Sequence, residues 1–262
     1  MKIGFIGAGN MGSALALAAA KADGSQIYVY DKDNEKAIQL ANSINATILD
    51  SKKIAAECDF VFLGVKPNII PLAVAEIKDH LGKNTVLVSM AAGVAIEKIE
   101  GFFESNPPII RIMPNTPVSV GEGMILWCAN RLVTEARAND FLVAMKAAGS
   151  FDKIDESKID AASAISGCGP AFVYMFIEAL ADGAVASGLP RDKAMRYAAE
   201  TLVGAAEMVK QSGKHPGQLK DDVCSPGGST IEGVETLEAG RFRAAVSSAV
   251  INAYKKTVDL GK

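Results

Sequence analysis

The chain has 262 residues, 49% of them hydrophobic and 22% charged, which indicates a globular protein with one large or two modest domains. Its formal net charge is −3 and its lysines and arginines are scattered, so nucleic acid is not expected as a partner. Neither the two histidines nor the four cysteines have metal-ligand spacing, so no metal site and no Ser-His-Asp triad is expected.

The N-terminal residues and the length of the apolar runs indicate where in the cell the protein is expected. The apolar stretch at residues 3–7 is too short and too rich in glycine for the core of a secretion signal. No apolar run reaches the roughly 18 residues that a membrane-spanning helix requires. We therefore expect a soluble, cytoplasmic protein with no membrane partner.

The first part of the chain alternates short β-branched runs with helical stretches, which is typical of βαβ units in a parallel sheet. The expected strands are unbroken hydrophobic runs at residues 2–6, 26–30, 59–65, 85–89, 109–113 and 123–128. Helical segments at residues 13–22 and 36–42 suit the crossover connections. This pattern predicts an α/β fold, with a Rossmann-type, mostly parallel, doubly wound sheet over residues 1–156.

From Ile159 onward strand patterns are absent, and helices are expected at residues 171–186, 192–211 and 243–258. The first of these helices is apolar nearly all the way round, apart from a narrow stripe formed by Glu178 and Asp182. One chain does not easily enclose such a helix within a helical segment of this size. We expect an all-helical C-terminal dimerisation domain over residues 157–262; burial against the first domain alone is the alternative.

Residues 7–12 read GAGNMG, the G-x-G-x-x-G spacing, directly after a strand and at the start of a helix. In that context Gly7 allows the tight turn, Gly9 lets a pyrophosphate approach the backbone, and Gly12 allows close helix–strand packing. The helix N-terminus adds free amides and a partial positive charge. We expect a nicotinamide dinucleotide to bind here, in contact with Gly7, Ala8, Gly9, Asn10 and Met11.

Asp31 stands at the end of the second expected strand. An acid at this place usually binds the ribose hydroxyl pair of NAD and repels the 2′-phosphate of NADP. Lys32 beside it partly offsets that repulsion. Both residues are expected to contact the cofactor, and a solvated turn carboxylate is the alternative.

Three further strand ends meet at the same edge of the sheet, where such sheets hold their ligands. Small residues there leave room for a flat ring, and prolines fix the path of the chain. The residues expected to wall a nicotinamide pocket are Val65, Lys66, Pro67, Ala91, Ala92 and Asn115. We do not expect Lys66 to transfer a proton directly.

Residues 224–232 read CSPGGSTIE. Ser229 and Glu232 have the spacing of a capping box, so a helix should begin here. Two glycines before it leave the amides of Gly228, Ser229 and Thr230 unshielded, which makes an anion site sized for a carboxylate. The Thr230 hydroxyl adds a polar group at the same point, and an ordinary glycine-rich cap is the alternative.

Six segments together carry a resemblance to a known family. They are GAGNMG at 7–12, VKP at 65–67, MAAG at 90–93, RIMPNTP at 111–117, SGCGPAFVYMFIEALADG at 166–183 and HPGQLKDDVCSPGGSTIEG at 215–233. The first is common to many dehydrogenases, whereas the last is highly specific. On these motifs the chain resembles pyrroline-5-carboxylate reductases along nearly its whole length.

The resemblance implies an enzyme that reduces 1-pyrroline-5-carboxylate to L-proline with NADPH or NADH, the last step of proline biosynthesis. It also implies a homodimer, open to further assembly, in which one chain's cofactor faces the 225–230 loop supplied across the dimer. In that loop the amides of Ser229 and Thr230 would hold the substrate carboxylate, and the Thr230 hydroxyl would face the ring nitrogen as the catalytic group. The substrate-binding residues are thus Ser225, Gly227, Gly228, Ser229 and Thr230.

Two positions depart from the family pattern. Ser229 stands where many relatives have threonine, which matters little if the backbone amide binds the substrate. Asp31 stands where many relatives have a small or hydroxyl residue suited to NADP. The sequence therefore leaves the preference between NADPH and NADH open, and we expect both to work within about tenfold of each other.

Two other functions stay open. A two-domain hydroxyacid dehydrogenase has the same plan but needs a lysine early in the first long helix of its second domain, where residues 169–174 read GPAFVY. A non-catalytic dinucleotide sensor would have no reason to keep residues 225–230. An imine nitrogen can carry a proton before hydride arrives, so the lack of a motif histidine is expected for a C=N reductase.

Overall fold

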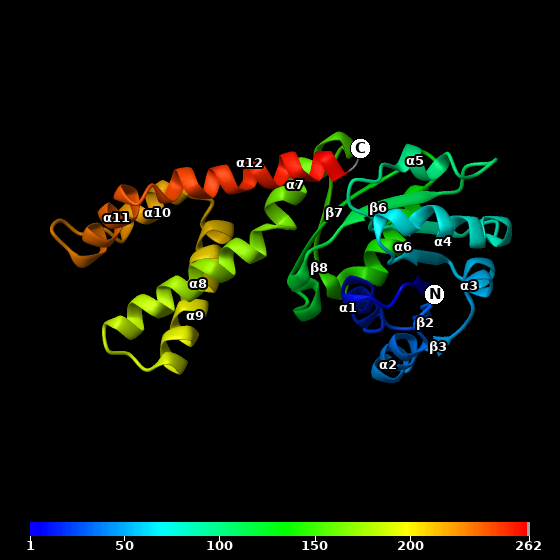
Figure 1. The fold of residues 1–262 in the computed structure, drawn as a ribbon, viewed down its shortest axis with the longest axis horizontal. Coiled ribbons are helices and arrows are strands. Elements are labelled where there is room, and N and C mark those ends of the chain that lie inside the picture. The colour runs from blue at the N-terminus through cyan, green and yellow to red at the C-terminus, as the bar shows by residue number, and fades with distance from the viewer. Residues whose placement is uncertain (261–262) are drawn as a thin grey trace. The chain divides into compact units, whose positions relative to one another are not determined.

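The computed structural model describes residues 1–260 and divides into two compact units. The sheet unit holds Met1–Cys168 together with the chain from Ala253 onward, and the helical unit holds Gly169–Asn252. Figure 1 shows strands and helices in the sheet unit and only helices in the helical unit. The predicted order of an α/β sheet domain followed by a helical domain is confirmed.

The sheet unit is built on an eight-stranded sheet in the order β3-β2-β1-β4-β5-β6-β7-β8. Neighbouring strands are parallel except for β6 and β7, which are antiparallel. The strands are β1 (Lys2–Ile6), β2 (Gln26–Tyr30), β3 (Thr47–Ile48), β4 (Phe60–Leu63), β5 (Val86–Ser89), β6 (Ile109–Met113), β7 (Gly123–Ala129) and β8 (Gly149–Lys153). The order reverses between β1 and β4, and this switch point is where doubly wound sheets bind dinucleotides.

The sequence pattern missed β3 and β8. The two residues of β3 are exposed, and β8 reads GSFDK with no fully buried residue, so neither is an unbroken hydrophobic run. The remaining strands are confirmed to within two residues at either end, β4 being the one that ends two residues early.

Seven α-helices complete the sheet unit up to residue 168. They are α1 (Asn10–Ala19), α2 (Asn34–Ile44), α3 (Ser51–Glu57), α4 (Ile70–Ile77), α5 (Ile96–Glu100), α6 (Glu135–Met145) and α7 (Glu156–Ser166). The helix expected from residue 13 begins earlier, at Asn10, because Gly9 with its extended backbone is the N-cap. The second half of the glycine motif is therefore helical.

Both faces of the sheet are covered by hydrophobic layers, as strand β4 shows. Phe60 and Phe62 pack into the layer that includes α1 and α6, whereas Val61 and Leu63 pack into the layer that includes α3 and α4. Phe62 also stacks on Phe5 of β1, with ring centroids 4.6 Å apart. Each such fully buried side chain contributes roughly 1.5–3 kcal/mol, so the sheet unit has a large core of its own.

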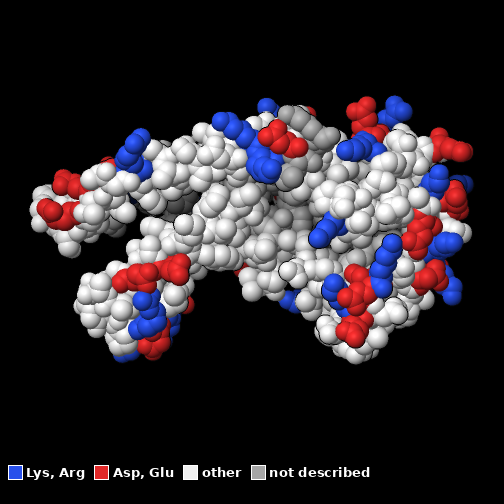
Figure 2. Space-filling view, viewed as in Figure 1, with Lys and Arg blue, Asp and Glu red and all other residues white. Residues whose placement is uncertain are grey.

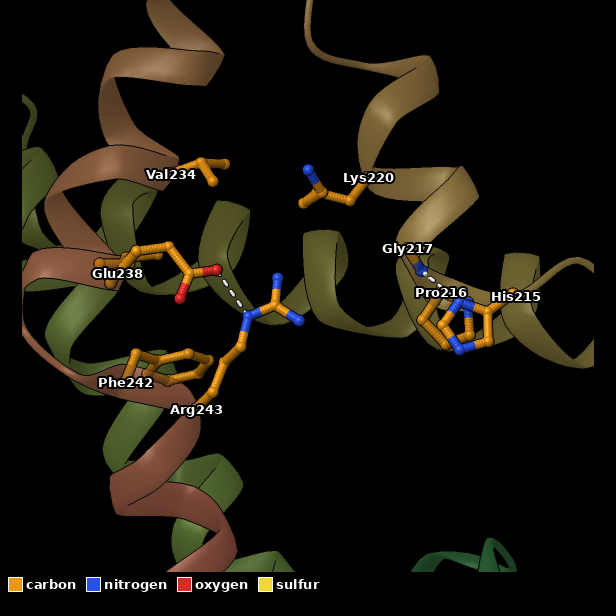
Figure 3. A pocket seen from close by; sticks show the side chains of 9 residues that line it. His215, Pro216, Gly217, Lys220, Val234, Glu238, Phe242 and Arg243 are labelled. Atoms are coloured by element: carbon orange, nitrogen blue, oxygen red, sulfur yellow. Dashed lines mark hydrogen bonds and ion pairs between the residues drawn. The ribbon is translucent and has the colours of Figure 1, made fainter.

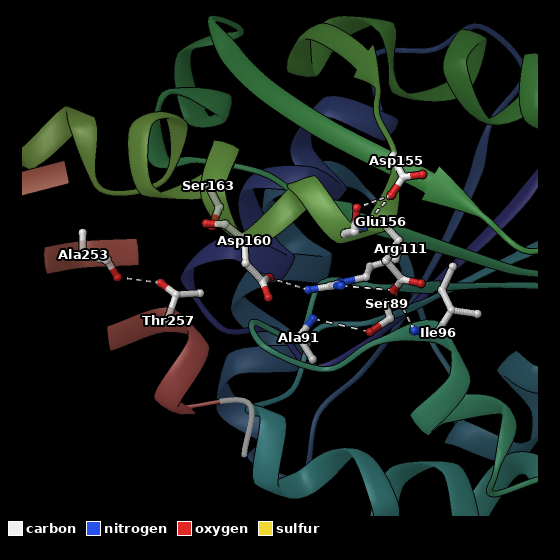
Figure 4. A network of polar contacts seen from close by, with 11 residues as sticks. Ser89, Ala91, Ile96, Arg111, Asp155, Glu156, Asp160, Ser163, Ala253 and Thr257 are labelled. Carbon is white, nitrogen blue, oxygen red and sulfur yellow. Dashed lines mark hydrogen bonds and ion pairs between the residues drawn. The ribbon is translucent and has the colours of Figure 1, made fainter. Parts of the chain in front are cut away.

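Helix α7 is fixed to the sheet through the buried Arg111 of β6 (Figure 4). The Arg111 guanidinium donates to Glu156 at 3.1 Å and to Asp160 at 2.8 Å, both in the first half of α7. Glu156 also accepts the Ile96 amide at 2.8 Å. At the other end of α7, Asn115 donates to the Ser166 carbonyl at 2.8 Å, so the helix is held at both ends.

The helical unit buries little apolar surface by itself. Its helices are α8 (Gly169–Ala186), α9 (Arg191–Ser212), α10 (Pro216–Asp222), α11 (Ser229–Ala239) and the first part of α12 (Phe242–Leu260). Its buried cluster consists of Ala181, Ala194 and Ala198. Figure 2 shows broad uncharged surface on these helices between groups of charged side chains.

Helix α9 has large apolar side chains exposed in the single chain, with Met195 at 40% and Val209 at 41%. Among the described residues one stretch, Glu156–Ala186, has the length and composition of a membrane-spanning helix, which differs from the expectation of no such run. Only 11% of its most apolar window is buried. Length and composition pick out this stretch because α8 is apolar on most of its faces.

Candidate active site

The glycine turn after β1 has the geometry of a dinucleotide site. Gly7 has φ 109°, and a Cβ on it would lie 2.5 Å from the Gly64 carbonyl oxygen of the chain after β4. A Cβ on Gly12 would lie 2.3 Å from the Gly7 oxygen, whereas one on Gly9 would meet no atom within 4 Å. Gly7 and Gly12 thus permit close backbone packing, and Gly9 leaves the approach to the helix open.

The N-terminus of α1 is suited to an anion. Its N-cap Gly9 has no side-chain capping bond, and the first turn contains no acidic residue. The amides at Asn10 and Met11 therefore face the turn without a capping side chain, beside the positive end of the helix dipole. The residues present fit a pyrophosphate at this point.

Asp31 ties the end of β2 to the glycine turn. Its Oδ2 accepts the Ala8 amide at 2.6 Å, and its Oδ1 accepts the Asp33 amide at 2.9 Å. The Ala8 amide is thus used by Asp31. A carboxylate has about four acceptor positions, so Asp31 keeps capacity for ribose hydroxyls.

A cavity of about 220 Å³ lies between the ends of β1, β2 and β4 and helix α4. Its lining includes Gly7, Gly9, Asp31, Lys32, Val65 and Lys66 from the predicted cofactor set. Tyr30 lines it too, and burial, followed by the nearby Glu76 and Asp31 carboxylates, raises the pKa of its hydroxyl. Tyr30 is therefore a neutral donor at pH 7.

A second cavity, of about 630 Å³, adjoins the ends of β4 and β5. Lys66, Pro67 and Ala92 line it, and Lys66 lines both cavities. Ala91 is instead 1% exposed and packs in the hydrophobic layer behind the site. Its small side chain fills the core, so any contact with a ligand would come from its backbone.

Asn115 is buried, and both ends of its amide bond to backbone. It accepts the Met124 amide at 2.9 Å and donates to the Ser166 carbonyl at 2.8 Å. The side chain joins the end of β6 to β7 and α7. Its contact with the cofactor stays a prediction.

The loop before α11 presents the predicted anion site. Gly227 has φ 64°, the Gly228 amide donates to the Ser225 carbonyl at 3.0 Å, and α11 begins at Ser229. Within residues 1–260 the amides of Ser229 and Thr230 have no acceptor. Two of the three predicted amides are therefore open, and the Thr230 side chain is exposed beside them.

The predicted capping box is wrong, although the helix starts where expected. The N-cap is Gly228, with φ −83° and ψ 168°, and no side chain caps the helix. Ser229 is already the first helical residue, so its hydroxyl is not at the capping position. Without that hydroxyl in the way, the first amides stay accessible.

The helical unit also contains a mostly apolar cavity of about 490 Å³ among α10, α11 and α12 (Figure 3). His215 there caps α10, with Nδ1 accepting the Gly217 amide at 3.0 Å, and Arg243 donates to Glu238 at 2.5 Å. No pattern in the sequence indicated this cavity, because its walls come from three helices. The His215 side chain thus caps the start of α10.

Comparison with known proteins gives consistent results along the chain. Residues 156–260 match the family model for pyrroline-5-carboxylate reductase dimerisation, and residues 2–93 match that for NADP oxidoreductase, coenzyme F420-dependent. The chain is 40% identical to pyrroline-5-carboxylate reductase of Arabidopsis thaliana, covering 100% of this chain and 96% of the relative. It is 41% identical to that of Escherichia coli, covering 100% and 98%.

Two solved structures are similar over their full length. Pyrroline carboxylate reductase of Plasmodium falciparum with NADP bound has a TM-score of 0.89 at 36% identity, covering 100% of this chain and 98% of the other. 1-Pyrroline-5-carboxylate reductase of Streptococcus pyogenes has a TM-score of 0.90 at 30% identity, covering 99% and 98%.

Proposed function

The chain belongs to the pyrroline-5-carboxylate reductase family, and we propose that it reduces the C=N bond of 1-pyrroline-5-carboxylate to L-proline with NADPH or NADH. One observation carries this proposal: the open amides of Ser229 and Thr230 at the start of α11, beside an exposed hydroxyl. Such a site suits the carboxylate of a small amino or imino acid. The glycine turn in the sheet unit supports the dinucleotide half of the reaction.

The cofactor site is assigned to residues of the sheet unit. The α1 amides at Asn10 and Met11 would meet the pyrophosphate, and Asp31 with Lys32 would meet the ribose. Lys66, Pro67 and Ala92 line the adjoining cavity and would wall the nicotinamide. When bound, the reduced cofactor supplies the hydride.

The substrate loop would act by positioning. The Ser229 and Thr230 amides would clamp the carboxylate, with Ser225, Gly227 and Gly228 shaping the turn that presents them. Holding the reacting carbon in place is the larger part of catalysis for such a transfer. The Thr230 hydroxyl would orient the ring nitrogen and exchange its hydrogen bond as the nitrogen loses its positive charge.

We also infer that the helical domain, residues 157–262, forms a homodimer. The exposed apolar side chains on α8 and α9 support this, because a stable soluble monomer rarely leaves so many uncovered. A partner subunit would cover the Glu156–Ala186 stretch as well. Light scattering on the purified protein would test the dimer and any larger assembly, and cell fractionation would test the expected cytoplasmic location.

A turnover assay tests the function. Purified protein mixed with NADPH and 1-pyrroline-5-carboxylate should lose the nicotinamide absorbance and form L-proline. Binding of NADPH without turnover would instead support the dinucleotide sensor, and turnover of a 2-keto acid would support the hydroxyacid dehydrogenase.

A further inference from the structure

The 220 Å³ cavity contains a carboxylate that the proposed reaction does not use. Glu76 of α4 lines it, together with the apolar side chains of Val65, Ile69 and Ala73. A pyrophosphate at the α1 amides and a ribose at Asp31 would direct the base of the dinucleotide into this remaining part. This part of the cavity thus offers apolar walls for a flat ring and the Glu76 carboxylate at its edge.

Glu76 is held by a buried donor. The Ser51 hydroxyl, 1% exposed at the start of α3, donates to Glu76 Oε1. Among the described residues Oε2 has no hydrogen-bond or ion-pair partner, and Glu76 itself is half-buried. Removing a carboxylate from water without pairing it is costly, so a half-buried carboxylate with one oxygen open is a place for a donor from a ligand.

We propose that Glu76 accepts a hydrogen bond from the 6-amino group of adenine and makes the enzyme selective for adenine dinucleotides over 6-oxo ones. An ionised carboxylate only accepts, and adenine presents an amino donor where hypoxanthine presents a carbonyl acceptor. The 6-oxo base would place a carbonyl acceptor against the Glu76 oxygen where adenine places a donor. The proposal rests on the proposed dinucleotide function and names the group that reads the base.

Equilibrium binding tests the proposal without turnover. Nicotinamide fluorescence measures the dissociation constant of the intact protein for NADPH and for deamino-NADPH. In deamino-NADPH hypoxanthine replaces adenine. The wild-type protein should bind deamino-NADPH about tenfold or more weakly, the loss expected for a hydrogen bond to a charged group. Equal affinity for the two would overturn the proposal, whatever any variant does.

Three variants test which residue causes the difference in affinity between the two dinucleotides. Glu76→Gln should bring the two dissociation constants together, because the glutamine amide can donate to the 6-oxo group as well as accept. Ser51→Ala should reduce the ratio partly, since the carboxylate loses the donor that holds it. Asp79→Asn removes an exposed carboxylate just beyond α4 and should keep the wild-type ratio.

A wild-type ratio that persists in Glu76→Gln would overturn the assignment to this residue. The outcome is separable from that of the main proposal. A protein that discriminates between the dinucleotides but does not reduce 1-pyrroline-5-carboxylate would contradict the proposed function and keep the role of Glu76. A protein that reduces 1-pyrroline-5-carboxylate but binds the two dinucleotides equally would support the proposed function and contradict the role of Glu76.

Discussion

The two units differ in how much of their apolar surface they bury by themselves. The sheet unit has hydrophobic layers on both faces of its sheet, with Phe5, Phe60 and Phe62 fully buried. The helical unit has three buried alanines at its centre and many large apolar side chains at its surface. The sheet unit therefore has a complete core within one chain, whereas the helical unit leaves most of its large apolar side chains uncovered.

The largest effect is expected from a charge on the exposed apolar surface of the helical unit. Val203 of α9 is 62% exposed, and Val143 of α6 in the sheet unit is 68% exposed. Val203→Asp should weaken the dimer more than 100-fold and abolish turnover, because an unpaired charge buried at an interface costs roughly 3–5 kcal/mol. Light scattering measures the loss of the dimer, and the turnover assay measures the loss of activity.

Val143→Asp is the matched control and should leave assembly and turnover as in the wild type. Both valines lie on helices, so helix propensity is the same in the pair. If the two substitutions behaved alike, the difference drawn between the units would be wrong.

The next effect concerns the substrate loop. Thr230→Ala should lower kcat/KM for 1-pyrroline-5-carboxylate about 10- to 100-fold, the effect of losing a hydrogen bond to a charged group. Thr236→Ala in the same helix removes a hydroxyl that bonds the Glu232 carbonyl and should change kcat/KM little. An unchanged rate in Thr230→Ala would remove that hydroxyl from the mechanism.

A smaller effect is expected from the cofactor turn. The wild-type enzyme should use NADPH and NADH within about tenfold of each other, equal to about 1.4 kcal/mol. Asp31→Ser should shift the preference toward NADPH, since a carboxylate beside the 2′-phosphate is gone, and weaken both cofactors because the Ala8 amide loses its acceptor. Steady-state kinetics with each cofactor measures this, and a wild-type preference for NADPH beyond a hundredfold would show that Asp31 does not bind the ribose.

The smallest effect is expected from the buried cysteines at neutral pH. Burial raises the pKa of Cys58 and of Cys128 in the sheet unit to about 12. Both stay protonated and buried at pH 8, so an alkylating reagent should reach at most Cys168 and Cys224 in the native protein. Mass spectrometry after labelling would show the sites, and rapid native labelling of Cys58 would contradict the closed core.

The raised pKa of these two thiols also determines how the free energy of unfolding changes with pH. The folded pKa lies above the ordinary thiol value of 9.0, so the protonated form is the one that the fold favours. This contribution to the free energy of unfolding is intact below pH 9. It should fall as pH rises from about 9 toward 12, where the unfolded chain ionises first.

The sequence allowed prediction of the features that depend on local pattern. The strands at Lys2–Ile6 and Gln26–Tyr30 were predictable because each is mostly hydrophobic after a polar first residue. The glycine turn was predictable because its spacing, after a strand and before a helix, has one common structural solution. The start of α11 was predictable for a similar reason, although the capping residue was wrong by one position.

The features that the sequence did not reveal depend on distant residues. Ser51 and Glu76 belong to no motif, and the pair arises because α3 and α4 pack on the same face of the sheet. Asn115 stands in a motif, but its bonds to Met124 and Ser166 come from the tertiary fold. Such contacts set the edges of the candidate site, and no periodicity in one segment encodes them.

Arg111 has a consequence for how the chain is completed during synthesis. Its guanidinium is buried in β6, and both of its carboxylate partners belong to α7, more than forty residues later. Until residue 160 has left the ribosome, the emerging sheet would contain a buried cation without a counter-ion, which costs roughly 3–5 kcal/mol. The nascent chain should therefore stay open at β6 and close over that strand only when α7 arrives.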